Sequence, residues 1–186
     1  MQRITALVFI LVMAGPALAD KQEKQRAKIV AMSEEVLADL YELKPETKKM
    51  VRDAEGYAVF SNVGINLVLL SAGGGRGVVV DNDNGSRTFM DMGTAGVGIG
   101  LGVKDFRGVF IFHSRKAMTN FINHGWDFSG QADAAAKSGD KGAEGNLAAT
   151  AVNGVSLYQM TRAGLALQAT LQGTKYWRNR KLNGDR

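Results

Sequence analysis

A glycine run is the stretch of this chain that most resembles a phosphate-binding loop. GGGRG at residues 73–77 follows an apolar segment, as such loops do. A Walker A loop also needs a Gly-Lys pair, which the sequence lacks, and the dinucleotide fingerprint would need glycine at Val78. Because a strand-like segment follows the run, we expect no helix N-terminus there to hold an anion. The pattern favours close approach between strands over nucleotide binding.

Acidic residues and histidines give no stronger pattern. DNDNGS at residues 81–86 begins like a calcium loop, but the required glycine and bidentate glutamate are replaced by Ser86 and Met92. Its Asn-Gly pair predicts a hairpin turn instead. His113 and His124 lie eleven positions apart, without the ligand spacing of a zinc site.

A nucleophilic triad has equally little support. Ser129, His124 and Asp127 could be assembled into one only by assumption, and no G-x-S-x-G elbow is present. We therefore predict no catalytic residue, no metal and no cofactor. A hydrolase remains an alternative that rests on the two histidines alone.

Cations beside aromatic rings mark the C-terminal end as the first candidate binding segment. Residues 175–186 hold five basic residues and one acidic residue, whereas residues 20–174 hold 17 of each. Rings and cations together suit a membrane interface, where rings lie at headgroup level and cations meet anionic lipid. The candidate lipid-binding residues here are Lys175, Tyr176, Trp177, Arg178, Arg180 and Lys181. An ordinary solvated C-terminus with Trp177 against the core is the alternative.

The N-terminal region carries an export signal and a second, weaker basic segment. Arg3 precedes an apolar run over residues 4–15, and Ala17-Leu18-Ala19 has the form that signal peptidase cleaves. We predict a signal peptide over residues 1–19 and an exported, periplasmic protein. The helix expected next begins with further candidate lipid-binding cations, Lys21, Lys24, Arg26 and Lys28. They are weaker candidates because Asp20 and Glu23 lower the net charge of the segment.

Hydrophobic periodicity supplies the elements that must position these residues. Apolar residues at helical spacing predict a helix over residues 20–43, and Pro45 fits the first turn of a short second helix ending near Gly56. A third helix is expected over residues 114–123, with Ser114 as its N-cap and Gly125 as its stop.

From residue 57 the period becomes two, which predicts strands. They are YAVFSNV, RGVVVD, SRTFMDM, GVGIGLGV, RGVFIFHS, WDFSGQAD, VSLYQMT and LALQATLQ, and residues 134–150 are the best candidate for a mobile loop. The expected fold is α+β, with a glycine-rich, mostly antiparallel β core that is barrel- or sandwich-like. A long N-terminal helix and one or two short helices complete it. Without any cysteine, this core must be held by packing alone.

Several long blocks, in order, resemble the lipid-binding SYLF domain family, also named for yeast actin-binding endocytic proteins. They are YAVFSNVGINLVLLSAGGGRGVVVDN, MGTAGVGIGLGVKDFRGVFIF, WDFSGQADAAAKSGD and GVSLYQMTRAGLALQATLQGTKYW. The resemblance runs from about residue 30 to residue 177. It implies a single domain over residues 20–177, followed by a basic tail over residues 178–186.

The resemblance also implies a non-enzymatic module that binds phospholipid, phosphoinositides in eukaryotic members, through an amphipathic N-terminal helix and a basic surface. For an exported chain we expect anionic phospholipid or a membrane surface as the partner, with neither actin nor nucleic acid. A structural or protein-interaction module of the cell envelope, without a lipid ligand, is the alternative.

Overall fold

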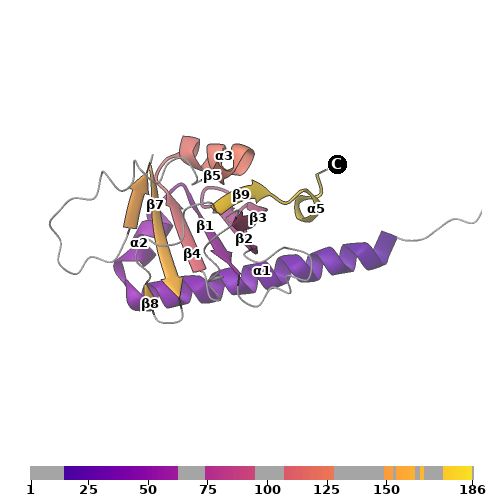
Figure 1. Ribbon diagram of the computed structural model, residues 1–186, viewed down its shortest axis with the longest axis horizontal. Helices are drawn as coiled ribbons and strands as arrows, with labels where there is room; N and C mark the ends of the chain where they lie inside the picture. The colour runs from indigo at the N-terminus through magenta and orange to yellow at the C-terminus, as the bar shows by residue number, and fades with distance from the viewer. Residues whose placement is uncertain are drawn as a thin grey trace, which may run out of the picture.

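One antiparallel sheet with helices on both faces forms the body of the protein (Figure 1). The computed structural model describes residues 15–62, 74–94, 107–127, 149–152, 154–161, 164–165 and 174–185. The helices are α1 (Gly15–Leu43), α2 (Glu46–Asp53), α3 (Arg115–His124) and α5 (Arg180–Asn183). The strands are β1 (Gly56–Ser61), β2 (Gly75–Asp81), β3 (Arg87–Thr94), β4 (Arg107–Phe112), β5 (Trp126–Asp127), β6 (Ala149–Val152), β7 (Val155–Thr161), β8 (Gly164–Leu165) and β9 (Thr174–Arg178).

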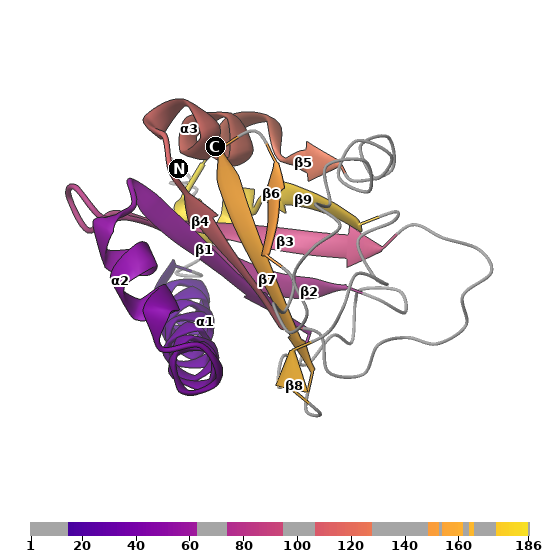
Figure 2. The same cartoon turned by 90° about the vertical axis from the view of Figure 1, so that its left-hand side faces the viewer.

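The strand order of the sheet places β9 beside β3, the second strand of the β2–β3 hairpin. The order is β5-β9-β3-β2-β1-β4-β7-β6, with β8 also paired to β7, and every pairing between described strands is antiparallel. The strands curl as one sheet and not as two stacked sheets (Figure 2). The expected α+β class is therefore confirmed, with the barrel-like form nearer to what is observed than the sandwich.

Alternation along the strands divides the core between the two faces of the sheet. Val59, Val109 and Ile111 pack toward α1 and α2, whereas Phe60 and Phe110 pack toward α3. Successive strand residues point to opposite faces, so apolar runs such as these require cover on both sides. The views agree that α1 and α2 lie on one side and α3 on the other (Figures 1 and 2).

Close packing explains the glycines of β2. A Cβ built on Gly77 would lie 2.2 Å from the carbonyl oxygen of Val59, and one on Gly75 would lie 2.6 Å from that of Ser61. Neither glycine is among the described glycines of positive φ, so close approach and not an unusual backbone conformation is the reason for them. Gly85 does adopt a positive φ, of 70°, in the predicted turn between β2 and β3.

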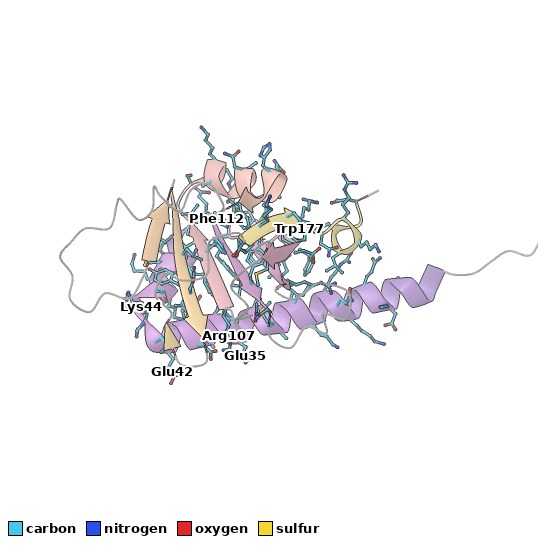
Figure 3. All side chains as sticks on the ribbon, viewed as in Figure 1. Glu35, Glu42, Lys44, Arg107, Phe112 and Trp177 are labelled. Atoms are coloured by element: carbon cyan, nitrogen blue, oxygen red, sulfur yellow. The ribbon has the colours of Figure 1, made fainter. Side chains whose placement is uncertain are left out.

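Helix α1 is held along the sheet by its buried stripe and by a partly buried cation of β4. Ile29, Val36 and Leu40 are almost wholly buried, as their spacing predicts. Arg107 of β4 reaches across to hydrogen-bond Asp39, and it lies 4.0 Å from Glu35 (Figure 3). The helix begins at Gly15, earlier than the expected residue 20, and its N-terminal part projects beyond the sheet (Figure 1).

The two short helices also follow their sequence signals. Helix α2 begins directly after Pro45. Helix α3 is capped by Ser114, whose Oγ accepts a hydrogen bond from the backbone N–H of Ala117, and it ends at Gly125 with a φ of 69°. These predictions are confirmed, as are the strands of β1, β2, β3, β4 and β7.

Several expectations fall outside the described residues. They are the apolar signal run before residue 15, the strand GVGIGLGV, most of WDFSGQAD and LALQATLQ, and residues 134–148 of the expected mobile loop. The last two residues of that loop, 149 and 150, belong to strand β6.

Candidate functional site

The C-terminal segment is part of the folded body and not a solvated tail. Met92 of β3 pairs with Tyr176 of β9, and Asp91 pairs with Trp177. Helix α5 follows at once, and its Leu182 is only 2% exposed. This corrects the expectation of a separate basic tail over residues 178–186, because a buried leucine anchors the segment.

Asparagines fix α5 against β3. The Oδ1 atom of Asn179 caps the helix by accepting a 2.8 Å hydrogen bond from the backbone N–H of Leu182. Its Nδ2 atom donates to Asp91, also at 2.8 Å. Asn183 accepts a 2.9 Å bond from the backbone N–H of Phe89 and donates a 2.7 Å bond to its carbonyl. Both asparagines thus satisfy polar groups that a docked segment would otherwise leave unpaired.

Arg26 joins the two basic segments that the sequence suggests separately. Its Nε atom donates a 2.7 Å hydrogen bond to the carbonyl of Leu182, and its guanidinium lies over the Phe89 ring, 5.9 Å from the centroid. Beneath this contact, Ile29, Val78, Phe89 and Leu182 form one apolar cluster. The N-terminal half of α1 and helix α5 are therefore neighbours, far apart in sequence but together in space (Figure 1).

The cations of the C-terminal segment differ in their surroundings. Arg180 and Lys181 are exposed and form no ion pair with any residue that the structure describes. Arg178 instead forms two hydrogen bonds with Asp185, of 2.5 and 3.0 Å. These bonds raise the pKa of Arg178 and lower the pKa of the Asp185 carboxyl. Arg178 thus serves the fold of this segment, whereas Arg180 and Lys181 present their charge to solvent.

The two aromatic rings of β9 lie on opposite faces of the sheet. Tyr176 is 2% exposed, with ring centroids 4.7 Å from Phe60 and 5.1 Å from Phe110, and burial raises the pKa of its hydroxyl well above the usual range. Its assignment as an interfacial ring is therefore wrong: strand alternation turns it into the core. Trp177 is 41% exposed and lies over Gly93 (Figure 3). Lys175, on the Trp177 side of the strand, is exposed.

The lysines of α1 form a separate stripe. Lys21, Lys24 and Lys28 recur every three or four residues, so they share one flank of the helix, and all three are exposed. Arg26 lies on a different flank, turned toward α5. Lys24 pairs with Asp20 at 2.8 Å, a surface contact of little energetic weight. The structure thus places the basic residues on two neighbouring surfaces.

We name these surfaces together the basic end of the molecule: the lysine stripe at 21, 24 and 28, and the exposed groups of Lys175, Trp177, Arg180 and Lys181. Sequence reasoning identified these residues but missed the contacts that join their segments. Asn179, Asn183 and Leu182 make those contacts, and the only local signal for them was an asparagine placed where it could cap a short helix.

Of the two histidines, His124 is exposed and His113 contacts a serine. The Nε2 atom of His113 lies 2.8 Å from the hydroxyl oxygen of Ser156, which is buried in β7. Among the described residues, no three His, Asp or Glu side chains come together in a way that could hold a metal ion. None of the described helices has the length and apolar character needed to cross a bilayer.

Comparison with known proteins places the chain beside one named relative. No family model matches the sequence. Over 160 residues the chain is 32% identical to Beta cell expansion factor A of Aeromonas veronii, an alignment that covers 86% of this chain and 59% of that protein. The chain therefore spans less than two thirds of the length of the curated relative that it matches.

Proposed function

We propose that this chain is a member of the lipid-binding SYLF family that is exported and binds the surface of anionic phospholipid membranes without catalysing a reaction. The ordered sequence blocks given above support the family assignment. The similarity to Beta cell expansion factor A adds a relative in a bacterium. A periplasmic location follows from the predicted signal peptide.

The observation that carries the proposal is the joining of the two basic segments by Arg26 and Leu182. Lys21, Lys28, Arg180 and Lys181 are exposed and lack an ion-pair partner among the described residues. Each cation held near an anionic surface contributes about 1 kcal/mol, and at physiological salt only charges within about 8 Å of the surface count. The contact of Arg26 with Leu182 brings the two helices that carry these cations together, so the proposal requires that both helices face the membrane.

Vesicle co-sedimentation provides the test. The protein should bind phosphatidylglycerol vesicles and leave phosphatidylcholine vesicles largely unbound, and its binding should weaken as salt rises. Replacing Arg180 and Lys181 by glutamine should lower the affinity about tenfold, taking part of the roughly 1 kcal/mol per cation as realised. Replacing Lys21, Lys24 and Lys28 by glutamine measures how much these three lysines contribute to the affinity for anionic vesicles.

A matched control keeps the result specific. Lys116→Gln also removes one exposed cation, but from α3, on the opposite face of the sheet. It should leave vesicle affinity within about twofold. Equal binding to neutral and anionic vesicles, or equal losses in the control and the double variant, would contradict the proposal. Absence of any vesicle binding would favour a protein-interaction module of the envelope.

A further inference from the structure

A recess at the other end of α1 is separate from the basic end. It has a volume of about 510 Å³, within the range of roughly 300–1,000 Å³ that small-molecule pockets occupy. It lies where the end of α1, helix α2, the start of β1 and the β2–β3 turn meet. Helix α2 and helix α5 lie toward opposite ends of α1, so one ligand does not serve both regions (Figure 1).

Apolar groups and aromatic rings provide much of the wall of this recess. Tyr41 of α1 and Tyr57 of β1 contribute their rings, Pro45 lies at the helix junction, and Val51 is almost wholly buried. The amide of Asn82 is committed to the structure, because its Nδ2 atom donates to the carbonyls of Val51 and Ala54 at 2.7 and 2.9 Å. The turn is thereby fixed against α2, and the recess is part of the folded scaffold.

Three hydrogen-bond donors in the recess, on Tyr41, Tyr57 and Lys48, have no partner among the described residues. Neither the Tyr41 nor the Tyr57 hydroxyl makes a hydrogen bond to any residue that the structure describes, and Lys48 forms no ion pair with the described residues. Burial, with the neighbouring Tyr57, raises the pKa of Tyr41, and burial also raises that of Tyr57. Both hydroxyls therefore remain protonated donors at neutral pH.

The charge around the recess is positive. Lys49 and Arg52 both contact Asp53, at 2.5 and 2.9 Å, so one carboxylate is shared between two cations. Lys48 adds a further ammonium, and Glu34 and Arg87 act on Tyr57 with opposite signs from α1 and β3. A ligand here would meet aromatic walls, two phenol donors and an excess of positive charge.

We propose that this recess binds a small organic anion with a flat apolar body, of the class of aromatic carboxylates. The rings of Tyr41 and Tyr57 would contact the flat body, since offset or edge contacts between rings add to simple burial. The carboxylate would accept hydrogen bonds from the two hydroxyls and from Lys48. Charge-assisted bonds of this kind are stronger than neutral ones. This inference is independent of the proposed membrane function.

Calorimetric titration of the purified protein with 2-naphthoate tests the proposal. Saturable binding in the micromolar to low millimolar range is expected, with 2-naphthalenemethanol, the neutral analogue, binding at least tenfold more weakly. Lys48→Gln should weaken naphthoate binding about fivefold or more. The double variant Tyr41→Phe, Tyr57→Phe keeps both rings, removes both hydroxyls, and should also weaken binding. Lys116→Gln, which removes a cation on the other face of the sheet, should leave it unchanged.

Each other outcome overturns the proposal in a defined way. No saturable heat with naphthoate means that the recess is not a site for this class of ligand. Equal affinity for the neutral analogue means that the cations play no part. Binding of inorganic phosphate or phenyl phosphate in preference to naphthoate would assign the site to phosphate chemistry instead. A circular dichroism spectrum and an unfolding midpoint like those of the parent are required of each variant, because Lys48 and Lys116 are exposed and the tyrosine variants keep both rings.

Discussion

Truncation of Leu182 tests whether the C-terminal segment is docked in solution. Leu182 is 2% exposed and packs with Ile29, Val78 and Phe89, so Leu182→Ala removes buried methyl groups and leaves a cavity. Core Leu→Ala changes cost about 2–5 kcal/mol. We expect about 2–3 kcal/mol here, at the low end of that range, because a helix of four residues can partly collapse onto the cavity. For a chain of this size, this corresponds to a fall in the melting temperature of roughly 4–12 °C.

Lys181→Ala is the matched control. It lies in the same four-residue helix, also becomes alanine, and is exposed. Surface changes of this kind stay within about 0.5 kcal/mol. Urea unfolding followed by circular dichroism gives both free energies, and the m-value should not change. If Leu182→Ala and Lys181→Ala have the same stability within error, the segment is not docked and the joining of the basic segments fails with it.

Limited proteolysis provides an independent readout of the same docking. Trypsin can cleave after Arg180, and a docked helix protects that bond in proportion to the free energy of its local opening. Leu182→Ala should therefore raise the rate of cleavage at this site at least severalfold, under conditions where the body stays folded. Unchanged cleavage would show that the segment is already open in the parent protein.

Other predictions concern the hairpin formed by β2 and β3. Gly77→Val should destabilise the fold by several kcal/mol, because its Cβ would meet the Val59 carbonyl oxygen at 2.2 Å, and normal expression with a parental melting curve would contradict this. Gly85→Ala should cost only about 1–2 kcal/mol, from its positive φ alone, since no atom lies within 4 Å of the added Cβ. Burial raises the pKa of Asp81, but hydrogen bonds from a backbone N–H and from Arg115 outweigh it and hold that pKa below its ordinary 3.8. The ionised Asp81 carboxylate therefore stabilises the fold above pH 3.8, and this stabilisation is lost as the pH falls through the lower pKa of the folded state. The parent should be more stable than Asp81→Asn at pH 7, and the difference in unfolding free energy should shrink in acid. A difference that stays constant with pH would contradict the role given to the Asp81 carboxylate.

Local patterns were sufficient to predict most helices and strands. The spacing of Ile29, Val36 and Leu40 indicated the buried stripe of α1, and Ser114 and Gly125 marked both ends of α3. These signals work from sequence because the partners lie within a few residues of each other. The antiparallel, glycine-rich sheet followed from alternation and turn residues in the same way.

The sequence did not predict the long-range pairing of strands. Strand β9 pairs with β3, which lies 80 to 88 positions earlier, and no property of KYWRN alone specifies that partner. The charges of the segment suggested a solvated tail, while Leu182 and the capping Asn179 were too few to predict a helix. The alternation that buries Tyr176 and exposes Trp177 was present in the sequence. In a segment of five residues, such alternation does not by itself distinguish a short strand from an irregular tail.

The recess beside α2 could not have been predicted for a related reason. Its walls come from α1, α2, β1 and the β2–β3 turn, and only the folded sheet brings Tyr41 beside Tyr57. In the sequence, nothing distinguishes the cations near residue 50 from those of any exposed helix face. Their placement around the Tyr41 and Tyr57 hydroxyls appears only once Asn82 has fixed the turn against α2.

Leu182→Ala also distinguishes charge from shape in the proposed membrane binding. The variant keeps every cation of the basic end and loosens the helix that carries Arg180 and Lys181, while the pairing of β9 with β3 keeps that segment at the same end of the body. Attraction to a fluid anionic surface depends on the number of charges within about 8 Å and not on a fixed arrangement of them. We therefore expect Leu182→Ala to bind phosphatidylglycerol vesicles within about twofold of the parent at a temperature where the body is folded, while the glutamine variant of Arg180 and Lys181 loses about tenfold. If both variants lose affinity equally, recognition requires the docked helix, and a purely coulombic account of this surface is wrong.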